Sequence, residues 1–208
     1  MRKFALLVSL VAGLAFPSFA QKDKKAGDLL DAMGKKFQAL DAYNAAFTYA
    51  AAGDSYKGDV TVKGTKFRLK LAGQEVFNDG KTVSTYVKET NEVNVQDFEG
   101  TTGDINPAKI YTIYKNGYNY KYVGEQKQAG QAVEVVELTP EKKNTQVAKV
   151  QIAVNKKDKS VKSWKITDKA GKVTSYTITQ FTPNPKLADN YFNFDKSKYP
   201  GVEVVDLR

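Results

Sequence analysis

The side chains that could do chemistry in this sequence are carboxylates, lysines and tyrosines, because the chain contains no histidine and no cysteine. This composition excludes Ser-His and Cys-His nucleophilic catalysis, thiol redox chemistry, disulfides, zinc fingers and haem attachment. Paired carboxylates are the remaining catalytic device, and a glycosidase needs two of them facing one cleft at a fixed separation. The acidic residues considered for that role are Glu75, Asp79, Glu89, Glu92, Asp97, Glu99, Asp104, Glu134, Glu137 and Asp168.

These acids fall mostly at turns or at polar positions of alternating stretches, so we interpret them as solvated surface groups. We therefore expect no enzyme, no catalytic residue, no metal and no cofactor. The weak alternative is a hydrolase with an acid of raised pKa in a cleft.

The aromatic residues indicate an apolar interior of one of two kinds. The chain has 12 tyrosines and 11 phenylalanines among 208 residues. Aromatic side chains pack well on pleated surfaces, so they could simply fill a β-rich core. They could also line an adaptable cavity for an acyl chain. Composition does not separate these two interpretations.

The N-terminal segment predicts export. Arg2 and Lys3 precede an apolar run over residues 4–16, and a small residue, Ala20, ends the segment. This pattern is typical of a secretory signal peptide. The run would rise about 20 Å as a helix, too short for a hydrocarbon layer of roughly 30 Å. We predict a signal peptide over residues 1–20 and a periplasmic, soluble chain from residue 21 to 208.

The net charge of +9 suggests an anionic partner, but the distribution of the lysines argues against it. Most lysines are dispersed as the polar members of alternating stretches, where they discourage edge-to-edge strand pairing. We therefore expect no nucleic-acid binding.

The periodicity of the apolar residues predicts two short helices and roughly ten strands. Apolar residues from Ala26 to Leu40 recur at spacings of three and four, which predicts an amphipathic helix. A second short helix is predicted from Pro107 to Gly117, because proline suits a helix start and glycine a helix end. The predicted strands are residues 46–49, 59–63, 66–71, 82–88, 92–98, 118–124, 133–139, 146–155, 161–167 and 173–181, with 76–77 before a turn at 78–81.

So many consecutive antiparallel strands favour a curled sheet over a flat one. The apolar stripes of the helices need a partner, and the concave face of such a sheet is the only large one available. The predicted fold is α+β, mainly β: an incomplete antiparallel β-barrel closed by an N-terminal helix and a short inserted helix that form a lid.

The order of several local motifs resembles one protein family. The motifs are Leu30 and Met33 with Phe37 and Leu40; Phe47 and Thr48; residues 58–63 (GDVTVK) and 66–69 (KFRL); residues 78–83 (NDGKTV) ending in Tyr86; residues 91–93; the Pro107 helix; and Ser163-Trp164 leading to Ser175-Tyr176. The chain is similar to LolA-type outer-membrane lipoprotein carriers, in particular the divergent LolA-like branch, over nearly all of residues 21–208.

The resemblance implies a function and a set of partners. Such carriers take lipoprotein acyl chains into an apolar cavity under a helical lid. They receive lipoproteins from an inner-membrane ABC-type release complex and deliver them to the outer membrane. We expect this chain to be a monomeric carrier of that kind, with an unspecified outer-membrane acceptor. The expected cavity and lid residues are Leu30, Met33, Phe37, Leu40, Phe47, Phe67, Leu69, Leu71, Tyr86, Ile110, Ile113, Tyr114, Trp164 and Tyr176.

The sequence also departs from the family pattern at the lid. Better-known members carry an Arg-Pro pair before the phenylalanine that matches Phe67, and the arginine hydrogen-bonds the lid shut. Here residues 63–65 are Lys-Gly-Thr, and lysine lacks the planar donor fork of arginine. Lys63 is therefore a candidate for the residue that holds the lid shut, with hydrogen bonds that differ from those of an arginine. Two alternatives stay open: a carrier or sensor of another hydrophobic ligand, and a structural envelope protein with a solidly packed interior.

Overall fold

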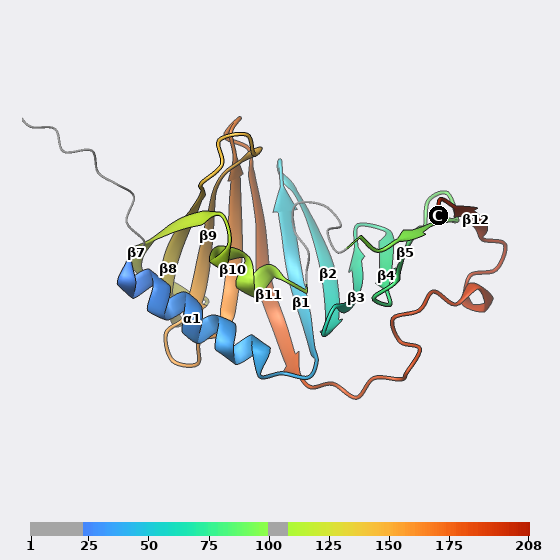
Figure 1. The fold of residues 1–208 in the computed structure, drawn as a ribbon, viewed down its shortest axis with the longest axis horizontal. Helices are drawn as coiled ribbons and strands as arrows, with labels where there is room; N and C mark the ends of the chain where they lie inside the picture. Colours follow the sequence, from blue (N-terminus) through green and yellow to red (C-terminus); the bar gives the residue numbers. More distant parts are fainter. Residues whose placement is uncertain (1–22, 100–107) are drawn as a thin grey trace, which may run out of the picture.

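The protein folds as one strongly curled β-sheet with a helix lying across its concave face (Figure 1). A computed structural model describes residues 23–99 and 108–208. The predicted signal peptide, residues 1–20, lies outside the described residues. Within those two ranges, no helix is both long and apolar enough to cross a membrane.

The N-terminal helix α1 spans Lys24–Gln38, and its capping follows from the sequence. The carboxylate of Asp23, at the N-cap, accepts hydrogen bonds from the backbone N–H groups of Lys25 and Ala26. Lys35 and Lys36 lie in the last turn, where cations favour the helix dipole. The predicted apolar stripe is buried along one side of the helix, through Ala26, Leu29, Leu30, Met33 and Phe37.

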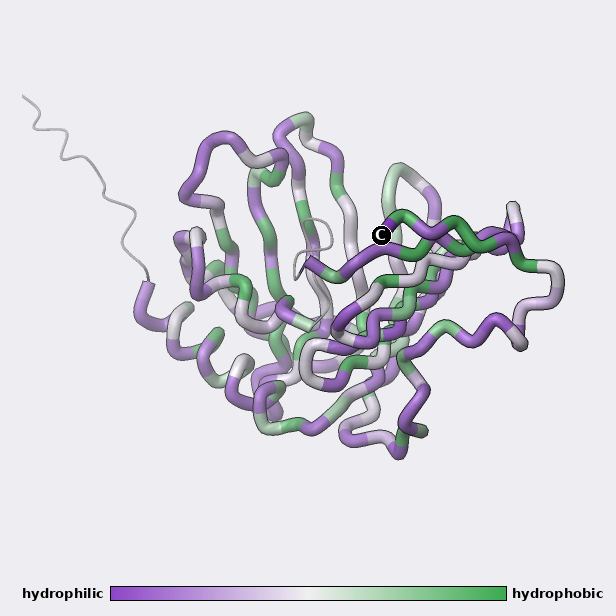
Figure 2. Tube along the Cα trace, turned by 45° about the vertical axis from the view of Figure 1, so that its right-hand side comes forward, coloured by the Kyte–Doolittle hydropathy of each residue, from purple (hydrophilic) through white to green (hydrophobic). Residues whose placement is uncertain are grey.

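Twelve strands make up the sheet of the described residues, and hydrophobic and hydrophilic residues alternate along many of them (Figure 2). The strands are β1 Tyr43–Ala51, β2 Asp54–Lys63, β3 Lys66–Leu71, β4 Gln74–Asn78, β5 Thr82–Val87, β6 Glu92–Asp97, β7 Tyr118–Gln128, β8 Gln131–Pro140, β9 Val147–Asn155, β10 Val161–Asp168, β11 Val173–Pro183 and β12 Glu203–Asp206. Their order is β12-β6-β5-β4-β3-β2-β1-β11-β10-β9-β8-β7. The end strands β12 and β7 are not hydrogen-bonded neighbours, so the sheet is open, as predicted.

The strand order contains two meanders joined through the pairing of β1 with β11. The first meander ends at β6, next to one edge of the sheet, and the second begins at β7, the other edge. The chain between them must therefore cross the sheet. The short 3-10 helix η1, Ile110–Lys115, lies on this crossing, above the concave face (Figure 1). It confirms the predicted inserted helix, although the start expected at Pro107 lies outside the described residues.

The C-terminal segment, residues 184–202, leads from the end of β11 to the edge strand β12 (Figure 1). Tyr199 donates a hydrogen bond from its hydroxyl to a carboxylate oxygen of Glu75 at 2.8 Å, and its ring packs 4.5 Å from that of Tyr86, centroid to centroid. Burial, reinforced by Glu75, raises the pKa of Tyr199 to about 12. The sequence did not predict β12, a four-residue strand that exists only through its parallel pairing with β6.

One glycine in β2 is required by a close approach of neighbouring groups. A Cβ atom at Gly58 would lie 2.7 Å from the carbonyl oxygen of Lys70 and 2.7 Å from Cζ of Phe47. Gly58 pairs with Phe47 on one side and with Leu71 on the other. Glycine therefore allows the Phe47 ring to approach the backbone of β2 closely.

We predict that Gly58→Ala lowers the free energy of unfolding by about 1–3 kcal/mol, because the added methyl forces the Phe47 ring or the strand to move. Urea denaturation measures the change. Ser55→Ala, at an exposed position of the same strand, serves as control and should change stability by no more than about 0.5 kcal/mol. Equal effects of the two substitutions would contradict the close packing at Gly58.

Candidate functional site

The most prominent candidate site is an apolar cavity of about 570 Å³ on the concave face of the sheet. Its wall is built by residues of β1–β3, the start of β7, β9–β11 and η1, and by the turn between β8 and β9. The lining residues are Tyr43, Ala45, Phe47, Val60, Leu69, Leu71, Ile110, Tyr111, Ile113, Tyr118, Lys142, Asn144, Thr145, Gln146, Val147, Val150, Trp164, Ile166, Tyr176 and Ile178.

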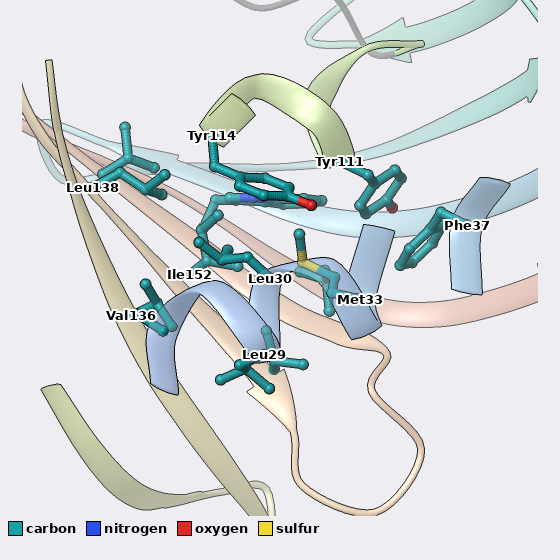
Figure 3. Packing of buried hydrophobic residues seen from close by; sticks show 14 of the residues in the cluster. Leu29, Leu30, Met33, Phe37, Tyr111, Tyr114, Val136, Leu138 and Ile152 are labelled. Atoms are coloured by element: carbon teal, nitrogen blue, oxygen red, sulfur yellow. The ribbon is translucent and has the colours of Figure 1, made fainter. Parts of the chain in front are cut away.

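The apolar stripe of α1 fills the concave face beside this cavity without lining it. Leu30 and Met33 are fully buried. Figure 3 shows them between the tyrosines of η1 and the strand residues Val136, Leu138 and Ile152. The concave face therefore has two parts: one is packed by the helix, and the other is open. Some aromatic residues therefore fill a packed core, and others line an open cavity.

A wall of aromatic rings separates the two parts. The ring of Phe37, on α1, stacks on that of Tyr111, on η1, with 3.3 Å between centroids and 7° between planes. Tyr111 in turn lies 5.4 Å from Trp164, and both residues line the cavity. Burial raises the pKa of Tyr111 and that of Tyr43 beside it. Their hydroxyls stay neutral near neutral pH, so the wall carries no charge.

Side-chain hydrogen bonds at its start, middle and end hold α1 against the rest of the fold. At its start, a carboxylate oxygen of Asp23 accepts a hydrogen bond from the backbone N–H of Tyr122 on β7, at 2.9 Å. In the middle, the Tyr114 hydroxyl on η1 donates to Asp31 at 2.6 Å. Near its end, the Lys36 ammonium donates to the carbonyl and the carboxylate of Asp158, in the turn between β9 and β10, at 2.7 and 3.1 Å. These contacts join the helix to three separate elements.

The structure divides the residues expected at the cavity and lid into three groups. The cavity wall includes Phe47, Leu69, Leu71, Ile110, Ile113, Trp164 and Tyr176. The packed core beside it includes Leu30, Met33, Phe37, Leu40, Phe67 and Tyr114. Tyr86 belongs to neither group.

Strand register explains the positions of Phe67 and Tyr86. Tyr86 pairs with Glu75, and both contact Tyr199 of the C-terminal segment on the outer face. Phe67 shares the inner face with Leu69 but is only 3% exposed, within the core cluster. Alternation along a strand determines which residues share a face. It does not determine which other element of the fold packs on that face.

Lys63 forms an ion pair with a carboxylate oxygen of Asp41 at 3.1 Å. Asp41 lies in the connection after α1, so the pair links β2 to that connection and not to the helix itself. Both side chains are largely exposed, and such pairs contribute about 0–1 kcal/mol. The contacts of Asp23, Tyr114 and Lys36 hold the helix more directly.

Sequence pattern does not single out several residues of the cavity. Tyr43 and Tyr111 are not among the predicted cavity and lid residues, although Tyr111 lies next to Ile110, which is. The polar residues Lys142, Asn144, Thr145 and Gln146 carry only the signal of a polar turn. Their position at the cavity follows from tertiary packing, because backbone hydrogen bonds join the β8–β9 turn to Gly117 before β7 and to Lys169 in the β10–β11 turn.

The comparisons with known proteins agree with this geometry. The family model described as "Outer membrane lipoprotein carrier protein LolA" matches residues 46–195, well over half of the chain. The chain belongs to the LolA family. This LolA-family chain is 31% identical over 127 residues to an outer-membrane lipoprotein carrier protein of Cupriavidus taiwanensis; the match covers 61% of this chain and 57% of that protein. It is 29% identical to the carrier protein of Cupriavidus pinatubonensis over 163 residues, 74% of each chain.

The fold of this LolA-family chain also occurs in a solved structure, that of an uncharacterized conserved protein from Thermus thermophilus. The TM-score is 0.61 at 14% sequence identity, and the match covers 88% of this chain and 99% of that one. At this identity the match establishes the fold alone.

We predict that leucines of the packed part and of the cavity wall differ in their contribution to stability. Leu30→Ala should cost about 2–5 kcal/mol, because it leaves a void among fully packed side chains. Leu69→Ala should cost about 1–2 kcal/mol, because Leu69 already borders open space and loses mainly its transfer free energy. Urea unfolding of the two variants makes the comparison. Equal costs would mean that the concave face is uniformly packed.

We predict that the contact between α1 and the β9–β10 turn weakens in acid. Burial opposes the charge of Asp158, but hydrogen bonds from Ser160 and Lys36 outweigh it and lower its pKa to about 2. The unfolded chain has the usual value near 3.9, so between about pH 4 and pH 2 the native state binds fewer protons. The contribution of Asp158 to stability is therefore complete above about pH 4 and is lost as the pH falls through 2.

The measurement is the free energy of unfolding at pH 6 and at pH 2.5. The parent should lose more stability on acidification than Asp158→Asn, which has no carboxylate to protonate. Asp54→Asn, at an exposed position at the start of β2, controls for the loss of one negative charge. The same acid sensitivity in the parent and in Asp158→Asn would show that this contact does not hold the helix.

Proposed function

We propose that this protein is a periplasmic carrier that holds the acyl chains of lipoproteins in the cavity and under α1, and takes them from the inner to the outer membrane. The observation that carries the proposal is the apolar cavity of about 570 Å³ beside a helix whose own apolar stripe occupies the rest of the concave face. Membership of the LolA family, and relatives named as lipoprotein carriers, support it. The role is one of binding and release, without a catalytic step.

The size of the cavity bears on how the cargo is held. Burying an acyl chain contributes about 0.8 kcal/mol per methylene, so several fully buried chains would exceed the practical limit of roughly 20 kcal/mol for non-covalent affinity. Cavities of about 300–1,000 Å³ hold one drug-sized ligand. Cargo with more than one chain therefore needs the space that Leu30, Met33 and Phe37 now fill.

Displacement of α1 makes such binding reversible. When cargo enters, the chains replace the helix stripe against the sheet, so the net affinity is a difference between two burials. The contacts of Asp23, Asp31 and Lys36 set the cost of moving the helix. A carrier with this arrangement binds strongly enough to solubilise its cargo and weakly enough to release it to a membrane acceptor.

The cellular setting follows from the N-terminal segment and the family. We propose that residues 1–20 direct export and are removed, and that residues 21–208 act as one carrier domain and as a monomer in the periplasm. The proposed donor is an inner-membrane ABC-type lipoprotein release complex. The acceptor is a component of the outer membrane that this chain does not define.

We predict that a charge on the cavity wall abolishes cargo binding. Ile178→Glu places a carboxylate inside the apolar cavity, where an acyl chain would have to desolvate it. The complex of the purified protein with a triacylated lipoprotein should no longer form in a detergent-removal assay, while the circular dichroism spectrum is unchanged.

The matched control is Val173→Glu on the same strand, at a position that is 39% exposed and outside the cavity. It should bind lipoprotein as the parent does. Undiminished lipoprotein binding by a folded Ile178→Glu protein would exclude this cavity as the carrier site.

A further inference from the structure

The lining of the cavity changes from apolar to polar at the end formed by the β8–β9 turn. The strands and η1 contribute mainly aliphatic and aromatic groups, whereas this turn contributes Lys142, Asn144, Thr145 and Gln146. Lys142, Asn144 and Gln146 are exposed to solvent, so this end is a polar mouth. Among the described residues that line the cavity, Lys142 is the only one with a charged side chain. It forms no ion pair with another described residue.

We propose that the cavity binds one fatty acid while α1 stays in place, with the acyl chain along the apolar wall and the carboxylate at Lys142. This inference concerns the same cavity as the proposed carrier function. It goes further in naming a ligand with a single chain and an anionic head, and in assigning the residue that selects the head.

The limit to one chain follows from the aromatic wall. Tyr111 and Trp164 border the cavity, and Phe37 is stacked on the far side of Tyr111. The space beyond that wall is occupied by fully buried side chains of α1. A volume of about 570 Å³ lies within the range that encloses one small ligand. A single chain can therefore enter from the polar mouth without breaking any of the contacts that hold α1.

The preference for an anionic head follows from the charges of the mouth. Lys142 lies between Glu141 and Lys143, so residues 141–143 carry a net positive charge. The backbone N–H of Glu141 donates to the carbonyl of Gly117, which fixes the turn beside η1. A carboxylate at Lys142 stays in contact with water and pairs with the ammonium, so it avoids the desolvation cost of a buried ion. A neutral head gains nothing from this pairing.

Trp164 provides a direct measurement of occupancy. It is the only tryptophan of the chain, is 6% exposed and lines the cavity. Its indole N–H has no acceptor among the described residues. A chain that enters the cavity changes the environment of this ring, so the fluorescence of Trp164 reports on occupancy of the cavity.

The first experiment titrates the full chain with laurate and, separately, with lauryl alcohol, and follows Trp164 fluorescence. We expect Lys142→Gln to weaken laurate binding about two- to fivefold, as for loss of one exposed ion pair, and to leave the affinity for the alcohol unchanged. Lys143→Gln, outside the lining residues, is the matched control and should change neither affinity. Equal effects of the two substitutions on laurate, or an equal effect of Lys142→Gln on acid and alcohol, would overturn the assignment of the head.

The second experiment tests the position of the chain and of the helix. Ala45→Phe fills the cavity from β1 and should abolish laurate binding, and Val60→Phe does so from β2. Lys36→Met removes the contact of α1 with the β9–β10 turn and should leave the laurate affinity unchanged. Persistent binding by a folded cavity-filled variant, or tighter binding by Lys36→Met, would overturn the inference.

The two proposals fail in different ways. Laurate binding that depends on Lys142, without any lipoprotein binding, would contradict the carrier function and leave this inference standing. Lipoprotein binding without a laurate response would do the reverse.

Discussion

One mismatch in size underlies the structure. The concave face of the sheet must be covered, and α1 is too narrow to cover all of it. A helix buries only one stripe, here Leu29, Leu30, Met33 and Phe37, against strands β8–β10. The crossing segment with η1 covers a further part because the chain must pass from the β6 side to β7. The cavity is the apolar surface that neither element reaches. Its existence is therefore a consequence of the element lengths and of the strand order.

The same mismatch explains how a stable fold could release its helix, as the proposed carrier function requires. The buried stripe stabilises the empty protein, yet it is held by a helix that meets the rest of the fold through few polar contacts, at Asp23, Asp31 and Lys36. Lys36 donates to Asp158 in the β9–β10 turn, whereas Lys63, the candidate from the sequence for holding the lid shut, pairs with Asp41 in the connection after the helix. Lysine binds its acceptors as a point charge, and the helix is held by modest contacts on three separate elements.

Part of the candidate site followed from sequence pattern, and part did not. Alternation places Leu69 and Leu71 on one face, and that face is the cavity wall. The same alternation does not say that Tyr86, from the neighbouring hairpin, lies on the opposite face. That depends on its pairing with Glu75 and on the C-terminal segment that covers both. Phe67 illustrates a second limit, since residues of one face can lie in the packed core or at the cavity according to their distance from α1. The β8–β9 turn joins the site through tertiary packing, which local sequence does not specify.

Residue types and their local spacing were enough to predict the absence of histidine and cysteine chemistry, the amphipathic helix, most of the strands and the need for a shared apolar interior. These properties depend on residue type and on periods of 3.6 and 2, which are local. Only the tertiary structure decided that the interior is half packed and half open, that Tyr111 and Trp164 divide it, and that Lys142 lies at its mouth. Those features arise from contacts between residues far apart in the chain, and their positions depend on strand order, twist and the closure of one element over another.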